Sequence, residues 1–349
     1  MGDRNAAFVG CDLSDKMAEI CVLDGNGAVI EAKRVQTTRV GLVKALKGYR
    51  CARVAIEAGT HSRWVEEVLS AAGHQVVVAN PRQVQLIWGR RKKTDRSDAM
   101  LLARLARVDV TLLAPVQHRS RGAQANLAVL RSRDLLVSLR TKLVNHVRGL
   151  LKQFGIRVEN CSTPAFGKHA QAVIPADLRA ALDPVLKTLV AVNEQIAVSD
   201  RGIEALVSRS STAQKLGEVD GVGPITALAF TLTIEDPTKF EKSRIVPAFL
   251  GLVPAKDQSG ESDPQKHISK AGNPFLRRLL VQCAHRLLGA FGTDCDLRRW
   301  GLALSARGGP AGKKRAVVAV ARKLAVVMHR IWVTGLPYDP HFNLNAARA

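Results

Sequence analysis

The chain has 349 residues, 46% of them hydrophobic, so it is long enough for two or three domains with buried cores. Its 52 Lys and Arg against 30 Asp and Glu leave a net charge of +22, which attracts polyanions. No stretch approaches about 20 consecutive apolar residues and no apolar signal core precedes the first strand pattern, which argues against a membrane. We therefore expect a cytoplasmic protein that binds nucleic acid.

The cysteine and aromatic residues of the chain indicate which kind of nucleic-acid-binding protein to expect. The six cysteines are scattered without Cys-x-x-Cys spacing, which favours reduced thiols over disulfides or structural zinc. Aromatic residues make up only 4% of the chain, too few for base-stacking platforms of the single-strand-binding kind. The expected contacts are Lys and Arg on phosphates, which position a duplex without reading its sequence.

The N-terminal third predicts a mixed sheet flanked by helices. Three strands come first, the second and third joined by the hairpin signal Asp24-Gly-Asn-Gly27, and helices then alternate with strands. The expected strands are 6–12, 18–23, 28–36, 53–57 and 75–79, and the expected helices are 40–46 and 64–72.

Two long helices are predicted next, over residues 123–153 and 175–207, the second of which Pro184 could interrupt. With the loop between them they suggest an antiparallel, coiled-coil arm. The C-terminal third predicts a helix over 225–233, a helix capped by Asn273 and a basic helix over 313–334.

The expected fold class is therefore α/β plus α. It comprises an N-terminal mixed sheet, a central arm of long helices and a mainly helical C-terminal domain. We place these domains at residues 1–115, 116–210 and 211–349.

Four acidic residues stand where predicted strands end or a helix begins. Asp12 and Glu57 close two strands, and Asp95 and Asp98 open the helix that follows the sheet. Acids placed in this way converge when the strands pair. We therefore expect the four carboxylates to form one site.

Their spacing within the helix predicts that the last two acids face inward. Asp95, Asp98, Leu102 and Leu105 fall at i, i+3, i+7 and i+10, so they share one helix face. Two carboxylates about 4 Å apart repel by roughly 4 kcal/mol at an effective dielectric constant of about 20. One or two Mg²⁺ ions, which prefer oxygen ligands, would remove this repulsion and assist phosphodiester chemistry.

A plain structural interpretation stays open beside this one. Asp12 could be a turn residue, and Asp98 could pair with Arg96 or Lys93. A run of four basic residues such as 90–93 is usually a solvated face, but its closeness to the acids favours guidance of phosphates. The predicted nucleic-acid contacts are Arg90, Arg91, Lys92, Lys93, Gly221, Gly223, Lys270, Arg277, Arg278, Lys313, Lys314 and Arg315.

Gly221-Val-Gly-Pro224 stands at the entrance of a predicted helix, where backbone N–H groups can approach a phosphate closely. A tight turn is the commoner explanation of such a segment. In this context it resembles the hairpin of helix-hairpin-helix DNA-binding modules.

Ser259 lies in a polar loop, where a serine is usually a hydrogen-bonding turn residue. A nucleophilic serine needs a base, a cation or a metal to activate it. Lys256, His267 and Lys270 are candidates, and the sequence does not choose among them.

Taken together, these segments resemble the DEDD-type transposases of the insertion-sequence family one-ten, which also includes Piv-type DNA invertases. The similarity covers essentially the whole chain. The segments that carry it are Phe8-Val-Gly-Cys-Asp12, Ile56-Glu-Ala-Gly-Thr60, Lys93-Thr-Asp-Arg-Ser-Asp-Ala99, Val222-Gly-Pro, Ser259-Gly and Ile268-Ser-Lys-Ala-Gly-Asn273.

The resemblance implies a RuvC-like, ribonuclease-H-type domain in which Asp12, Glu57, Asp95 and Asp98 bind metal. It further implies that Ser259 attacks DNA and becomes covalently joined to it. Donor and target double-stranded DNA and a structured guide (bridge) RNA are the implied partners. A homo-oligomer, a dimer or a tetramer, is implied as well, with acids of one subunit meeting the serine of another.

Two other function classes remain as alternatives. A RuvC-like Holliday-junction resolvase would use the acids and a metal-activated water, and would leave Ser259 without a role. A non-catalytic basic scaffold would leave the inward acids unexplained.

Overall fold

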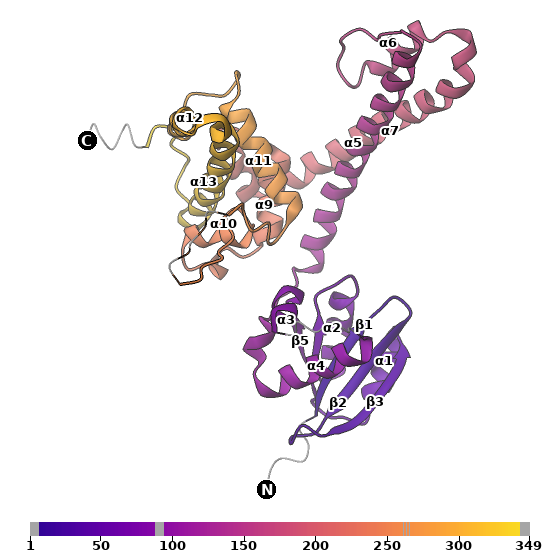
Figure 1. Ribbon diagram of the computed structural model, residues 1–349, viewed down its shortest axis with the longest axis vertical. Coiled ribbons are helices and arrows are strands. Elements are labelled where there is room, and N and C mark those ends of the chain that lie inside the picture. Colours follow the sequence, from indigo (N-terminus) through magenta and orange to yellow (C-terminus); the bar gives the residue numbers. More distant parts are fainter. Residues whose placement is uncertain (1–6, 88–93, 261, 263, 265, 343–349) are drawn as a thin grey trace. The chain divides into compact units, whose positions relative to one another are not determined.

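The computed structural model describes residues 7–87, 94–260, 262, 264 and 266–342 (Figure 1). The chain forms two compact units, Met1–His118 and Arg119–Ala349, which are described separately. Among the described residues, no helix is long and apolar enough to cross a bilayer. All six cysteines are free thiols.

The first unit is built on a five-stranded mixed sheet in the order β3-β2-β1-β4-β5. The first three strands form an antiparallel meander, and β4 and β5 run parallel to β1. The strands are β1 (Phe8–Leu13), β2 (Met17–Leu23), β3 (Val29–Gln36), β4 (Arg53–Glu57) and β5 (Gln75–Ala79).

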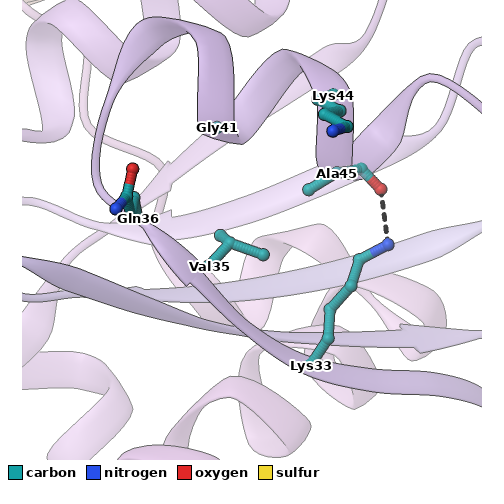
Figure 2. Close-up of a pocket in the computed structure, with 6 residues that line it drawn as sticks. All are labelled: Lys33, Val35, Gln36, Gly41, Lys44 and Ala45. Atoms are coloured by element: carbon teal, nitrogen blue, oxygen red, sulfur yellow. Dashed lines mark hydrogen bonds between the residues drawn. The ribbon is translucent and has the colours of Figure 1, made fainter.

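Helices cover both faces of this sheet, because alternate residues of the central strands are apolar on both sides. Helices α1 (Arg39–Leu46) and α2 (Ser62–Ala71) cover one face, and α4 (Asp95–Val108) covers the other. A cavity of about 340 Å³ lies between β3 and α1, where Lys33 Nζ donates to the Ala45 carbonyl (2.7 Å; Figure 2).

Helix α4 approaches β1 unusually closely at Gly10. A Cβ atom at this position would lie 1.8 Å from the carbonyl oxygen of Ala99 and 2.5 Å from the amide nitrogen of Ala103. Both distances are far below van der Waals contact and both involve backbone atoms. Glycine is therefore required here for the helix to lie on the sheet.

Two long helices open the second unit, α5 (Arg121–Gln153) and α7 (Arg179–Ser208), which pack against each other. Helix α6 (Phe166–Val173) packs on their far ends, around Phe166. The predicted interruption at Pro184 is wrong, because α7 continues through it. Pro184 has no N–H group, so α7 loses only the hydrogen bond to the carbonyl four residues earlier, which lies in the first turn of the helix.

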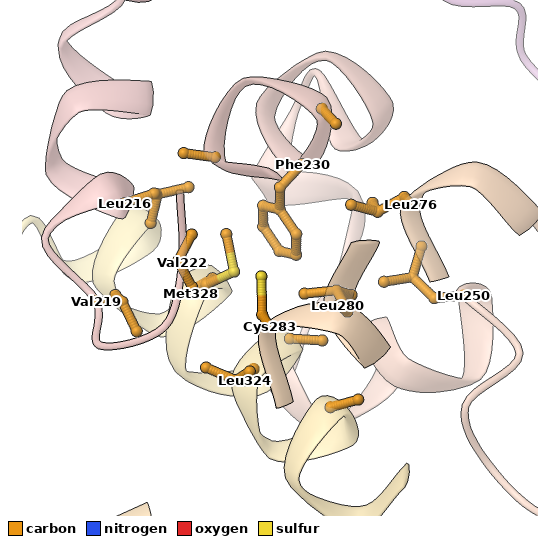
Figure 3. Packing of buried hydrophobic residues seen from close by; sticks show 14 of the residues in the cluster. Leu216, Val219, Val222, Phe230, Leu250, Leu276, Leu280, Cys283, Leu324 and Met328 are labelled. Carbon is orange, nitrogen blue, oxygen red and sulfur yellow. The ribbon is translucent and has the colours of Figure 1, made fainter. Parts of the chain in front are cut away.

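The remaining helices share one apolar core with the near ends of α5 and α7. Figure 3 shows Phe230 surrounded by side chains such as Leu216, Leu276, Leu280 and Met328. These helices are α8 (Ser211–Gly217), α9 (Pro224–Ile234), α10 (Val246–Phe249), α11 (Pro274–Leu288), α12 (Asp296–Arg307) and α13 (Gly312–Thr334).

The expected fold class is confirmed: a mixed sheet is followed by many helices. The three domain boundaries stay a prediction. The sequence had not predicted helices α3 (Pro81–Ile87), α6, α8, α10 and α12, most of which are short.

The contact at Gly10 gives the first testable prediction. We expect Gly10→Ala to lower the free energy of unfolding by about 3 kcal/mol, because backbone atoms of α4 must move away to make room. Urea unfolding measures this change. Gly48→Ala is the matched control, since its Cβ would meet no atom within 4 Å. Equal stability of the two variants would contradict the prediction.

Candidate active site

The strand register places the first two acids side by side. Cys11 of β1 pairs with Ile56 of the parallel strand β4, so the next residues, Asp12 and Glu57, are neighbours at the carboxyl ends of these strands. Asp12 alternates in phase with Gly10, so its side chain leaves the sheet on the face that α4 covers. The sheet therefore brings these two acids together as predicted.

Helix α4 runs antiparallel to β4, which brings its first turn to the same end of the sheet. Arg53 begins β4, and its Nη1 atom donates to the carbonyl of Ala106 near the C-terminus of α4 (3.2 Å). The N-terminus of α4 therefore lies towards the strand ends that carry the acids. Asp98, in this first turn, is only 9% exposed.

Asp95 corrects one sequence-based expectation. The helical spacing predicted that it would face inward with Asp98, Leu102 and Leu105, and those three are buried, whereas Asp95 is exposed. Asp95 is the first residue of α4. At this position the helix face that carries Asp98, Leu102 and Leu105 no longer lies on the sheet. Its role as a ligand stays a prediction.

A capping box fixes the start of α4. The amide of Ser97 donates to Thr94 Oγ1 (3.2 Å), and the amide of Thr94 donates to Ser97 Oγ (3.1 Å). Carboxylates in the first turn of a helix are also stabilised by its dipole. The capping box and the helix dipole thus give the positions of Asp95 and Asp98 a structural cause.

The acids are suitable ligands for a hard divalent cation, and the backbone gathers Asp12, Glu57 and Asp98 at one end of one face of the sheet. As the side chains lie, however, no three His, Cys, Asp or Glu side chains within the described parts of the chain are close enough to hold one ion. Cys11 does not add a thiolate, because burial and then the Asp12 carboxylate raise its pKa to about 12.

Sequence reasoning missed four polar residues near these acids, Glu19, Arg34, Asp15 and His61. Glu19 stands opposite Asp12 on β2 and therefore on the same face, and Arg34 pairs with it (3.4 Å). His61 follows β4, and its Nε2 atom lies 2.9 Å from Asp15 Oδ1 in the turn after β1. The only signals in the sequence were the short distances of Asp15 and His61 from the two strand ends.

Trp64 fixes the tautomer of His61. The indole Nε1–H can only donate, and it lies 3.1 Å from His61 Nδ1, so the ring proton of His61 is on Nε2 and points at Asp15. This hydrogen bond ties the turn after β1 to the loop after β4. The two segments follow β1, whose penultimate residue is Asp12, and β4, which ends at Glu57.

The second unit presents Ser259 at the tip of a loop. The chain from Val253 to Ser269 leaves and returns as two paired segments, with the amide of Ala255 donating to the His267 carbonyl (2.9 Å). At the tip, Ser259 and Ser262 exchange two backbone hydrogen bonds of 3.1 and 3.0 Å. The hydroxyl of Ser259 is exposed and takes no part in this pairing.

The base of this loop (residues 254–268, called the serine loop below) is closely packed. Cβ atoms on Gly251 and Gly272 would lie 2.2 Å from the Ala271 carbonyl and 1.9 Å from the Phe249 carbonyl, and both glycines have positive φ. Arg277 of α11 closes this base. Its Nη1 atom donates to the carbonyls of Leu250 (2.9 Å) and Ala271 (2.7 Å).

The predicted nucleic-acid contacts divide into several groups. Arg90, Arg91, Lys92 and Lys93 lie outside the described residues. Arg277 is half-buried and supports the serine loop, a structural role that the sequence did not indicate. Arg278 pairs with Asp134 of α5. Lys270, Lys313, Lys314 and Arg315 are exposed. Contact of these residues with nucleic acid stays a prediction.

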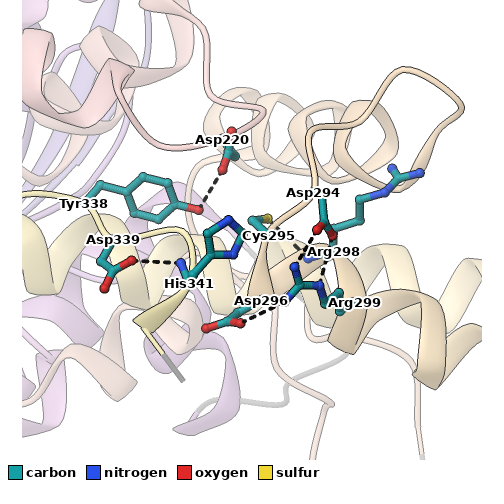
Figure 4. Close-up of polar contacts among 9 residues, drawn as sticks. All are labelled: Asp220, Asp294, Cys295, Asp296, Arg298, Arg299, Tyr338, Asp339 and His341. Carbon is teal, nitrogen blue, oxygen red and sulfur yellow. Dashed lines mark hydrogen bonds and ion pairs between the residues drawn. The ribbon is translucent and has the colours of Figure 1, made fainter. Parts of the chain in front are cut away.

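The Gly-x-Gly segment forms the turn between α8 and α9, with Gly223 as the N-cap of α9. The chain after α13 holds this turn, because Tyr338 Oη donates to Asp220 Oδ2 (3.2 Å; Figure 4). Burial, and then Cys295 and Asp220, raise the pKa of Tyr338, so the phenol stays a donor. The other two candidate activators of Ser259, Lys256 and His267, are both exposed in the serine loop.

Residues 9–156 match a profile described as Transposase, and residues 213–294 match one described as Transposase IS116/IS110/IS902 family. A probable family 20 transposase of Pseudomonas aeruginosa is 31% identical over 305 residues, 85% of this chain and 88% of the relative. The chain belongs to the IS116/IS110/IS902 transposase family.

Other relatives agree with this assignment. The transposase for insertion sequence element IS1111A of Coxiella burnetii is 28% identical over 93% of this chain and 89% of its own length. The pilin gene-inverting protein of Moraxella bovis is 24% identical over 76% of this chain and 75% of its own length. Members of this family are enzymes that cleave and join DNA, which explains the excess of positive charge.

Adjacent arginines of α11 allow the structural role of Arg277 to be tested. We expect Arg277→Ala to lower the free energy of unfolding by about 1–3 kcal/mol, because two carbonyls lose their donor. Arg278→Ala, the matched control, should cost under about 1 kcal/mol because its ion pair is exposed.

Urea unfolding measures both variants, and limited proteolysis reports whether the serine loop opens. Faster cleavage within residues 254–268 is expected for Arg277→Ala alone. If Arg278→Ala were the more damaging change, the assignment of the two arginines would be reversed.

Proposed function

We propose that this transposase cuts and exchanges DNA strands through a covalent phosphoserine intermediate, guided by a structured RNA. The observation that supports this best is the pairing of two features. One is a group of acids at one end of the sheet, and the other is an exposed serine on a loop whose base is locked. A DNA-joining enzyme needs both a means to stabilise the charge of a phosphodiester and a group that retains the cut end.

Asp12, Glu57, Asp95 and Asp98 would hold one or two Mg²⁺ ions. When bound, such ions neutralise the charge that develops on the phosphate oxygens. The chain itself supplies fixed positions for the acids: neighbouring strand ends for Asp12 and Glu57, and a capped first turn for Asp98. The hydrogen bond between His61 and Asp15 keeps the two adjoining loops together.

Ser259 would supply the nucleophile. Its Oγ atom attacks the phosphorus, the Oγ–P bond forms as the P–O bond to one sugar breaks, and the serine proton passes through a base or solvent to the leaving oxygen. A second strand end then attacks the phosphoserine, which restores the serine and seals the new joint. An exposed tip is needed for this step, because both DNA ends must reach the same hydroxyl.

Guide RNA, donor and target DNA and a homo-oligomer, a dimer or a tetramer, complete this proposal, together with a cytoplasmic location. The three domains 1–115, 116–210 and 211–349 are part of it too. Exposed Lys and Arg side chains would hold the nucleic-acid backbones. Base pairing with the RNA would choose the site.

The two serines at the tip of the loop make a matched test of the nucleophile. We expect Ser259→Ala to abolish the covalent protein–DNA adduct, because the attacking oxygen is removed. Ser262→Ala should keep it, since the tip pairs through backbone atoms that both variants retain. Denaturing gels of the protein incubated with labelled element-end DNA measure the adduct.

Adducts that persist in Ser259→Ala would remove this residue from the mechanism. Cleavage by the wild type without any adduct would instead favour a RuvC-like junction resolvase that uses a metal-activated water.

The acids are tested by isosteric changes at opposite ends of the sheet. We expect Asp12→Asn to slow Mg²⁺-dependent strand cleavage by about 100-fold or more, because one anionic ligand is lost. Asp24→Asn is the control. Its side chain accepts from the amides of Asn26 and Ala28 in the distant hairpin, and an asparagine can do the same. Cleavage at the wild-type rate by Asp12→Asn would show that this acid is structural.

A further inference from the structure

One aromatic side chain of the described structure is almost completely exposed. Phe291, in the loop between α11 and α12, is 99% exposed, while the next most exposed large apolar side chain, Val40, is 77% exposed. Other exposed aromatic side chains are partly covered: Lys323 lies over Trp300 and Arg330 lies over Phe342. An uncovered phenyl ring needs an explanation, because water solvates it poorly.

The loop that carries Phe291 is held at both ends. Arg298 of α12 reaches back and donates to the carbonyls of Leu287 and Gly289, the latter at 2.7 Å. Gly292 fits against the same turn, where its Cβ would lie 1.9 Å from the Leu287 carbonyl. The exposed ring therefore lies on a loop that is held by hydrogen bonds and close packing.

The second anchor of the loop is at the start of α12. Arg299 binds Asp294, with 3.0 Å between Nε and Oδ1, and the Sγ atom of Cys295 caps the helix. Figure 4 shows these side chains beneath the arch of the chain that precedes Asp294. Neither anchor involves Phe291, so the ring itself is not needed to hold the loop.

The segment that contains Phe291 is strongly basic in sequence. Residues 271–334, which form α11 to α13, contain twelve Lys or Arg and two Asp, a surplus of ten positive charges. Both acids are paired with Arg299. Arg286, one turn before the loop, is exposed. Such a surface repels a second copy of itself and attracts phosphates.

We propose that Phe291 stacks on a DNA base that is unstacked where the duplex is opened for strand exchange. Every base has a π face on which a phenyl ring can lie, and nearby arginines can hold the flanking phosphates. The inference rests on the action of this family on DNA. It does not depend on which residues cut the strand.

The test uses the full chain and a DNA duplex with one unpaired 2-aminopurine, compared with a fully paired duplex of the same length. We expect Phe291→Ala to bind the bulged duplex about 5- to 100-fold more weakly and to lose the quenching of 2-aminopurine fluorescence. Binding to the paired duplex should not change. The slope of log K against log salt should also stay the same, because no phosphate contact is removed.

Two further variants sharpen this test. Phe291→Trp should keep the wild-type preference for the bulge, since an indole also stacks. Phe154→Ala, which removes another exposed phenyl ring at the end of α5, should bind both duplexes as the wild type does. Because Phe291 has no packing role, both Phe291 variants should melt at the wild-type temperature.

Several results would overturn the inference. If Phe291→Ala bound the bulged duplex as tightly as the wild type, the proposed stacking contact would be ruled out. An equal loss of affinity of Phe291→Ala for both duplexes would show that the ring contacts paired DNA. A loss of affinity confined to a bulged RNA would show that it contacts RNA. A change of oligomer size in light scattering would show that it contacts another protein chain. Wild-type adduct formation by Ser259→Ala or wild-type cleavage by Asp12→Asn would contradict the proposed function and would leave this binding result unaffected.

Discussion

The position of α4 on the sheet is the constraint on which the candidate active site depends. Helix α4 can carry Asp98 to the ends of β1 and β4 only because Gly10 leaves room for the Ala99 carbonyl. The close contact fixes the height of the helix above the sheet, and the capping box fixes where its first turn begins. The backbone alone therefore brings the positions of these three acids together, whichever rotamers their side chains adopt.

The serine is positioned by a different principle. The acids sit on regular elements within packed layers, whereas Ser259 is at an exposed tip and its support is concentrated at the base, where Arg277 joins Leu250 and Ala271. A segment with a firm base and few contacts at its tip can open locally without unfolding the domain. That difference suits the two proposed tasks. Charge stabilisation requires fixed ligands, and a nucleophile that accepts one strand end and releases it to another requires access.

Much of the first unit could be predicted, because its strands alternate clearly and its turns are marked by glycine and asparagine. The inward position of Asp98 followed from its spacing to Leu102 and Leu105, but the same spacing failed for Asp95, since periodicity does not show where a helix leaves the sheet. The role of Arg277 could not be read from sequence, because its carbonyl partner Leu250 is 27 residues away. Ser259 stood out only through family resemblance, as nothing local distinguishes it from Ser262.

The charge of the chain gives a physical reason for the guide in the proposed function. In the proposed function, arginines and lysines on α11 to α13 would bind phosphates, and phosphate contacts give affinity that is the same for every sequence. Such a surface with few aromatic side chains would hold DNA firmly but select it poorly. The proposed stacking of Phe291 would add contact with opened strands without reading them, because stacking tolerates any base. Selection must then come from base pairing, which is the task that the proposed RNA would perform.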